Sequence, residues 1–106
     1  MLTLVQHDKK CIEPEVVKDA LQRKQKIQLI DVRQPTEYEQ EHIPLAVNIA
    51  LSELSQHIKQ LDNDSLIVTV STKGGGRSAL AAEILREFGL NAIWLCGGTT
   101  KWLAGG

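Results

Sequence analysis

The stretch of sequence that decides the fold reads, in three parts, Leu66-Ile-Val-Thr-Val70, Ser71-Thr-Lys-Gly-Gly-Gly-Arg77 and Ser78-Ala-Leu-Ala-Ala-Glu-Ile-Leu-Arg-Glu-Phe88. The first part is apolar apart from one threonine and rich in β-branched residues, which is typical of a parallel strand covered on both faces. The third part predicts an amphipathic helix, because Leu80, Ile84 and Phe88 recur on one stripe, with Ala81 and Leu85 beside it. The stretch therefore predicts a buried strand, a glycine-rich loop and a helix in succession.

The loop between this strand and helix has the composition of an anion-binding cradle. Three successive glycines, residues 74–76, permit positive φ and the close approach of a ligand. Successive backbone N–H groups can then form a nest, to which the following helix adds its positive end. Arg77 brings a forked, permanent cation and Lys73 a point charge. Such a cradle suits a nucleophile at its centre whose reactive form is an anion.

Strands and helices alternate along the rest of the chain, which predicts a parallel sheet with helices on both faces. We expect one α/β domain over residues 1–106, with three layers and a central, mostly parallel sheet of about five strands. Outside the central stretch we expect helices at 14–24, 35–41 and 51–61, strands at 27–30, 47–49 and 91–95, a weak edge strand at 2–5, and a last short helix capped by Thr99 or Thr100.

The composition excludes several classes of protein. A net charge of −1 over 106 residues gives no electrostatic case for binding nucleic acid or an anionic membrane. The apolar part of the N-terminus is too short for a signal peptide, so a cytoplasmic location is expected. Cys11 and Cys96 are the only cysteines; they are expected to be reduced and without a role in the site, and with three scattered histidines they offer no metal-ligand spacing.

Further motifs occur in order around the loop. They are Ile30-Asp-Val-Arg33, Glu37-Tyr38, Glu41-His-Ile-Pro-Leu-Ala-Val-Asn-Ile49 and Trp94-Leu-Cys-Gly-Gly-Thr-Thr-Lys-Trp102. Together with the loop they resemble the rhodanese family, the sulfurtransferases that carry sulfur as a cysteine persulfide. Glu41 and Leu45 stand where glycine is usual in that family.

One departure from the family concerns the loop itself. The family places cysteine first in the loop, and this chain has Ser71 there. If the loop is read one residue shorter, the position falls on Thr72 instead. We favour Ser71, because it directly follows the apolar strand and residues 73–77 then complete a longer loop. That length resembles the phosphatase-like branch of the fold.

The resemblance implies a sulfurtransferase that moves sulfane sulfur from thiosulfate or a persulfide donor to a thiol or cyanide acceptor, including the thiol of a partner protein, as a monomer without a cofactor. It implies Ser71, in place of cysteine, and Arg77 as the catalytic positions. It implies a substrate-binding set made of Thr72, Lys73, Gly74, Gly75, Gly76, Arg77 and Ser78. An oxygen lacks the low-pKa thiolate and the S–S exchange chemistry of sulfur, so this chain is expected to bind the anion and to be nearly inactive in transfer.

Two alternatives remain open. A naturally inactive domain of this type would serve as an anion-binding or regulatory module. A phosphatase or arsenate reductase is suggested by loop length alone. Near the site, we expect structural roles for four residues: Arg33 pairing with Glu37, Asp31 facing the cradle or capping a helix, and His42 hydrogen-bonded in a turn.

Overall fold

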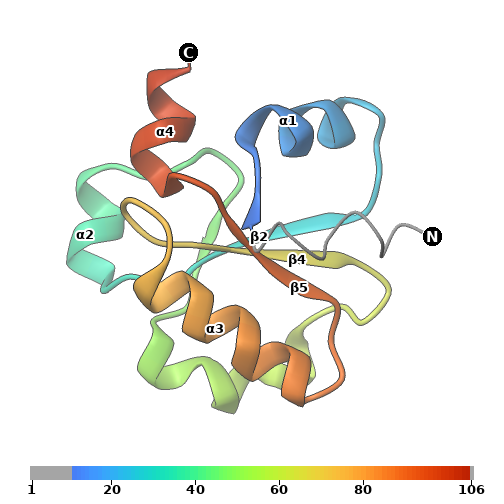
Figure 1. The fold of residues 1–106 in the computed structure, drawn as a ribbon. Coiled ribbons are helices and arrows are strands. Elements are labelled where there is room, and N and C mark those ends of the chain that lie inside the picture. The colour runs from blue at the N-terminus through green and yellow to red at the C-terminus, as the bar shows by residue number, and fades with distance from the viewer. Residues whose placement is uncertain (1–10, 106) are drawn as a thin grey trace.

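The computed structural model describes residues 11–105 and shows a five-stranded, entirely parallel sheet in the order β1-β5-β4-β2-β3 (Figure 1). The strands are β1 (Cys11–Ile12), β2 (Ile27–Asp31), β3 (Val47–Asn48), β4 (Leu66–Val70) and β5 (Ala92–Leu95). The predicted α/β fold is confirmed, with β4 at the centre of the sheet. The edge strand expected at 2–5 lies outside the described residues, and β1 holds the edge beside β5.

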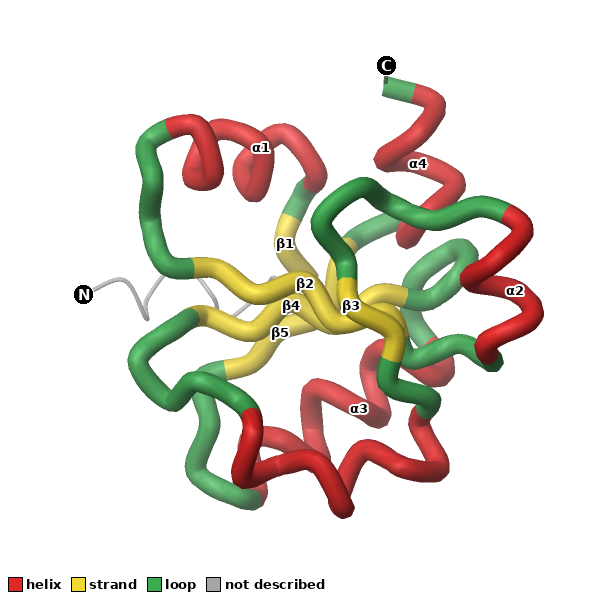
Figure 2. The backbone as a smooth tube through the Cα atoms, turned by 180° about the vertical axis from the view of Figure 1, so that it is seen from behind, coloured by secondary structure: helices red, strands yellow, loops and turns green. Residues whose placement is uncertain are grey.

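The helices are α1 (Pro14–Gln22), α2 (Pro35–Gln40), the 3-10 helix η2 (Leu51–Gln60), α3 (Gly76–Glu87) and α4 (Gly98–Ala104). Figures 1 and 2 show α1 and α4 on one side of the sheet and α3 with η2 on the other, while α2 lies by the ends of β2 and β4. Within residues 11–105 no helix combines the length and the apolar character needed to cross a bilayer.

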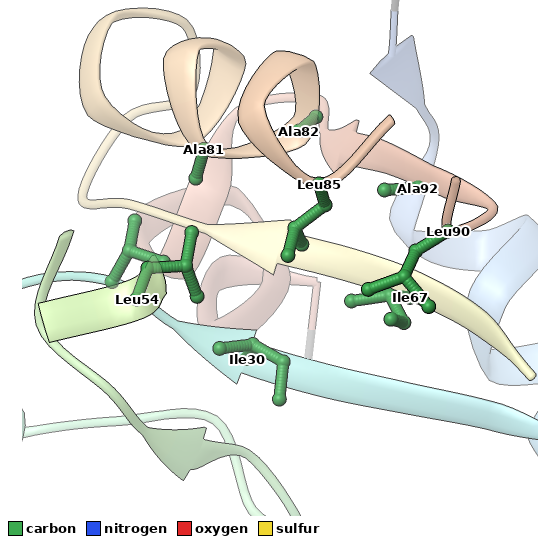
Figure 3. Packing of buried hydrophobic residues seen from close by; sticks show 9 residues of the cluster. Ile30, Leu54, Ile67, Ala81, Ala82, Leu85, Leu90 and Ala92 are labelled. Atoms are coloured by element: carbon green, nitrogen blue, oxygen red, sulfur yellow. The ribbon is translucent and has the colours of Figure 1, made fainter. Parts of the chain in front are cut away.

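Alternate residues of the central strand face two separate cores. Ile67 belongs to the cluster under α3 and η2, shown in Figure 3, whereas Val68 and Val70 belong to the cluster under α1 and α4. Each of the three is fully buried. This two-sided burial explains why β4 reads as a continuous apolar run, as parallel strands do.

The prediction of which α3 residues face the core is wrong in part. Leu80 and Phe88 are 48% and 58% exposed, and the helix meets the sheet through Ala81, Ala82 and Leu85. Small side chains let the helix axis approach β4 and β5 closely, which turns the larger residues toward solvent.

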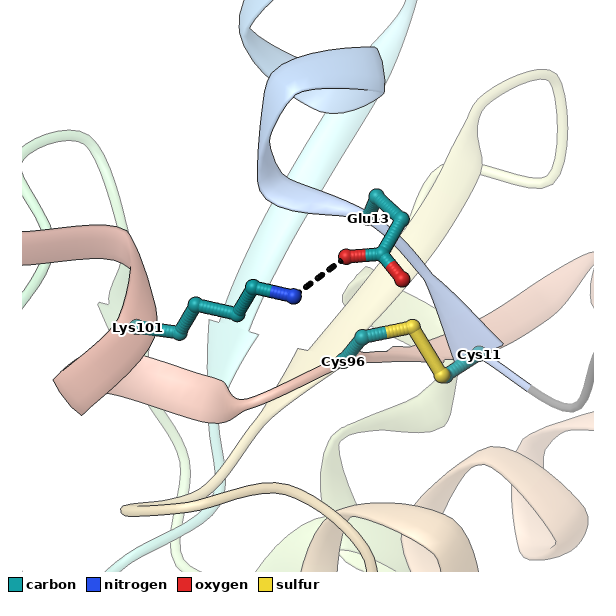
Figure 4. Close-up of a disulfide and its surroundings, with 4 residues drawn as sticks. All are labelled: Cys11, Glu13, Cys96 and Lys101. Carbon is teal, nitrogen blue, oxygen red and sulfur yellow. Dashed lines mark hydrogen bonds and ion pairs between the residues drawn. A yellow bond between two sulfur atoms is a disulfide. The ribbon is translucent and has the colours of Figure 1, made fainter. Parts of the chain in front are cut away.

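The expectation of two reduced cysteines is also wrong. Cys11 and Cys96 form a disulfide that joins the start of β1 to the end of β5 (Figure 4). The two residues are 85 positions apart in the chain. Parallel pairing of Cys11 with Trp94 and of Ile12 with Leu95 brings them together at the edge of the sheet.

Candidate functional site: the loop after the central strand

The loop lies at the carboxyl edge of the sheet, where ligands bind in folds of this kind. β4 ends at Val70 and α3 begins at Gly76, with Gly75 as its N-cap residue. Val70 is in register with Asp31 at the end of β2. The loop and the segment that follows β2 therefore lie next to each other.

The backbone N–H groups of the loop have no partner among the described residues. Gly74, Gly75 and Gly76 have φ values of 85°, 63° and 42°, which L side chains rarely adopt. Within residues 11–105, the N–H groups of residues 72–77 donate no hydrogen bond to another residue. Six successive amides thus keep their donor capacity at the positive end of α3, which is an arrangement that suits an anion.

Ser71 lies at the buried base of this loop. It is 4% exposed, and its hydroxyl donates a hydrogen bond of 2.9 Å to Oγ of Ser78. The hydroxyl of Ser78 donates in turn to the carbonyl oxygen of Gly75, at 2.8 Å. A thiolate in place of the Ser71 hydroxyl would have the Ser78 hydroxyl within reach, and that hydroxyl would donate to the thiolate by turning its one hydrogen away from the Gly75 carbonyl oxygen. Thr72, the alternative position, is half-buried.

The turn after β5 forms the floor of the loop. The N–H groups of Thr99 and Thr100 donate to the carbonyl oxygens of Ser71 and Thr72, at 2.9 and 3.0 Å. A Cβ on Gly98 would lie 2.4 Å from the Ser71 oxygen, so only glycine fits between them. The expected cap is therefore wrong: Gly97 is the N-cap residue of α4, and both threonines lie inside the helix, where they hold the loop.

Arg77 is held by an acidic residue from another helix. Its two terminal nitrogens donate to the two carboxylate oxygens of Glu37 on α2, at 2.9 and 3.0 Å. This bidentate pair lowers the pKa of Glu37 and raises the pKa of Arg77, in both cases chiefly through the hydrogen bonds between them. The side chains of Arg77 and Glu37 are 40% and 35% exposed, so the pair lies at the rim of the site.

The expected pairing of Arg33 with Glu37 is wrong, because Arg33 pairs with Asp31. Its Nε and Nη2 donate to the Asp31 carboxylate at 2.9 and 2.8 Å, and the Arg33 N–H donates to the same group. These bonds raise the pKa of Arg33. Asp31 is fully buried and Arg33 is 5% exposed, so the pair is a structural element beneath the loop. The Asp31 carboxylate is thereby committed to Arg33 rather than to capping α2, whose N-cap residue is Gln34.

His42 and Lys73 lie at the surface. Nδ1 of His42 donates to the carbonyl oxygen of Tyr38 and its ring stacks on the Tyr38 ring, which confirms the hydrogen bond, while the turn itself lies at Pro44 and Leu45. Lys73 is exposed on the loop. Among the described residues, no group of three or more His, Cys, Asp or Glu side chains is placed to hold a metal ion.

Two contributions to the site were missed at the sequence level. Glu37 binds Arg77 from 40 positions away, and Thr99 supports Ser71 from 28 positions away. The Gly97-Gly98 pair after a strand was the available signal for a close backbone approach. Nothing in the local sequence indicates which backbone it approaches.

Comparison with known proteins bears on this geometry. A family model described as a rhodanese-like domain matches residues 13–105. The uncharacterized protein YqhL of Bacillus subtilis is 42% identical over 78 residues, which make up 73% of this chain and 61% of YqhL. The thiosulfate sulfurtransferase PspE of Escherichia coli is 40% identical over 72 residues, or 65% of this chain and 67% of PspE. The match thus covers less than two thirds of the length of YqhL.

A solved structure agrees over most of the fold. A rhodanese-related protein from Thermoplasma volcanium superposes with a TM-score of 0.80 at 30% identity, covering 92% of this chain and 93% of that one. The similarity therefore extends over most of both chains.

Proposed function

The chain belongs to the rhodanese-like domain family, and on that premise we propose that residues 71–78 bind the anionic end of a sulfane-sulfur donor such as thiosulfate. The observation that carries the proposal is the run of amides at residues 72–77, which have no hydrogen-bond partner among residues 11–105 and directly follow the buried Ser71. The chain is homologous to thiosulfate sulfurtransferases, one of which is PspE. The name of these relatives indicates thiosulfate as the class of sulfur donor.

The proposed chemistry needs sulfur at position 71. A thiolate there attacks the outer sulfur of thiosulfate, the S–S bond breaks, and sulfite leaves with the bonding electron pair. The resulting persulfide passes its outer sulfur to cyanide or a thiolate, which restores the thiolate at position 71. The Ser71 hydroxyl cannot carry out this exchange, because an oxygen at neutral pH is neither ionised nor a partner in S–S exchange. We therefore propose that this chain binds the donor without transferring its sulfur.

A second candidate function is a regulatory module that binds an oxyanion or an acidic group of a partner. One observation favours it: the chain has two cysteines, and both are in the disulfide. No free thiol is left to carry sulfur. The two candidates share the anion-binding loop and differ in whether cysteine at position 71 restores transfer.

Replacing Arg77 with alanine is expected to weaken the binding of sulfate or thiosulfate by roughly 1.5–3 kcal/mol, the scale of a hydrogen bond to a charged group. Isothermal titration calorimetry measures this loss directly. Arg23→Ala is the matched control, since Arg23 is exposed at the end of α1 and, within residues 11–105, forms its ion pair with the nearby Asp19. Equal affinity in wild type and Arg77→Ala would show that Arg77 does not contact the anion.

Replacing Glu37 with glutamine is expected to tighten anion binding about fivefold. Glu37 neutralises Arg77, and one charge at about 4 Å contributes about 1 kcal/mol in water. Glu39→Gln, an exposed position on the same helix, is the control. Weaker binding by Glu37→Gln would mean that Glu37 serves to position Arg77 rather than to compete with the ligand.

A further inference from the structure

The disulfide is the one site of sulfur chemistry in this chain, since it contains both cysteines. Cys96 is 6% exposed, whereas Cys11, on the edge strand, is half-buried. Cys11 is therefore the more exposed of the two residues that the disulfide joins (Figure 4). An attacking thiolate that takes Cys11 Sγ releases Cys96 as the leaving thiolate.

The disulfide is connected to the loop through a short stretch of backbone. Cys96 is followed by Gly97 and Gly98, whose backbone lies against the loop: a Cβ on Gly74 would be 2.9 Å from the Gly97 nitrogen. Thr99 and Thr100 complete the stretch with their hydrogen bonds to the loop carbonyls. The position of residues 96–100 thus sets the floor on which the open amides rest.

Among residues 11–105, a short strand and several polar contacts hold this edge of the sheet. Within that range β1 has two residues and pairs with β5. Nζ of Lys18 on α1 also donates to the carbonyl oxygen of Trp102 on α4, at 3.2 Å, and lies over the Trp102 ring. An ion pair joins Lys101 to Glu13 nearby (Figure 4). Its Lys end is exposed, and exposed pairs contribute about 0–1 kcal/mol. The N–H of Cys96 donates to the carbonyl oxygen of Ile12, at 2.9 Å. The disulfide is therefore the covalent link between the chain entering α1 and the segment that forms the floor of the loop.

We propose that the Cys11–Cys96 disulfide is a thiol-reactive switch whose reduction lowers the affinity of the loop for anions; this inference rests on the proposed function. The reductant is a dithiol. One of its thiolates attacks Cys11, Cys96 leaves as a thiolate and takes up a proton, and the second thiol resolves the mixed disulfide. The dithiol is oxidised to a cyclic disulfide, and both cysteines are left as thiols. A loosened floor no longer holds the amides in place before binding, and that costs affinity.

The test compares oxidised and dithiothreitol-reduced wild type, with thiols counted by a colorimetric reagent and folding followed by circular dichroism. Sulfate affinity by calorimetry is expected to fall at least fivefold on reduction and to recover on reoxidation. The Cys11→Ser/Cys96→Ser variant is expected to match the reduced form and to ignore dithiothreitol. Equal affinity in both redox states, resistance of the folded protein to reduction, or unfolding on reduction would each overturn the switch.

A second readout separates this inference from the proposed function. Hydrogen exchange at the amides of residues 72–77 is expected to speed up on reduction, and it needs no ligand. If sulfate binds in neither redox state, the proposed function fails, while faster exchange still shows the coupling between disulfide and loop. If sulfate binds equally and exchange is unchanged, the switch alone fails.

Discussion

Replacing Ser71 with cysteine is expected to produce thiosulfate:cyanide sulfur transfer at least ~100-fold above the wild-type background, given that removing a nucleophile from an enzyme costs on the order of 10⁶ in turnover. Position 71 lies at the base of six open amides and the positive end of α3. Such surroundings lower a thiol pKa to roughly 3.5–7.5. The Ser78 hydroxyl, 2.9 Å from the Ser71 oxygen, can donate to the thiolate by turning its hydrogen away from the Gly75 carbonyl oxygen. Thiocyanate formation measures the gain.

Thr72→Cys is the matched control, because it introduces the same thiol one residue further along. Transfer by Ser71→Cys alone would assign the nucleophile position to residue 71, and transfer by Thr72→Cys alone would assign it to the shorter loop. Each variant is first checked for one free thiol, which shows that the Cys11–Cys96 disulfide is intact. Background activity in both variants would contradict the sulfurtransferase proposal and leave the binding module.

Replacing Asp31 with asparagine is expected to lower the free energy of unfolding by roughly 3–5 kcal/mol, the range for removing one partner of a buried ion pair. Asp31 is fully buried and accepts hydrogen bonds from both the side chain and the backbone of Arg33. Asparagine leaves the Arg33 guanidinium buried without a counter-charge. Urea unfolding followed by circular dichroism measures the loss.

Asp19→Asn controls for the loss of an aspartate from an ion pair. Asp19 pairs with Arg23 on the surface of α1, where the side chains are 59% and 68% exposed, so its loss is expected to cost below about 1 kcal/mol. Because domains of this size have only about 5–15 kcal/mol of stability, Asp31→Asn is compared at low temperature, where it remains folded. A cost similar to that of Asp19→Asn would show that Arg33 finds other partners, such as the Glu41 carbonyl oxygen that it already reaches.

The resemblance to the rhodanese family and the anion-binding loop could be recognised from the sequence because the residues that indicate them lie close together in the chain. An apolar β-branched run, three glycines and an amphipathic segment lie within 23 consecutive positions, 66–88. Pro14 and Pro35 each begin a helix, as their fixed φ predicts. These features follow from backbone preferences that act over a few residues, so they do not depend on how distant parts of the chain pack.

The partners of charged residues were not predictable in the same way. Arg33 has both Asp31 and Glu37 within four positions. The sequence favours Glu37 as its partner, but in the structure Arg33 pairs with Asp31. The outcome depends on Arg77, which arrives from α3 and takes Glu37. Only the placement of α2 beside α3 decides that competition.

The sequence by itself determined the parallel α/β sheet, the glycine-rich loop after its central strand and the absence of a thiol from that loop. Only the tertiary structure decided that Cys11 meets Cys96, that Glu37 neutralises Arg77 and that α3 packs through its alanines. The physical reason is that strand and helix periodicities are set by neighbours along the chain. The disulfide, the ion pairs and the buried helix face are set by distances between segments up to 88 positions apart, which only the folded sheet brings together.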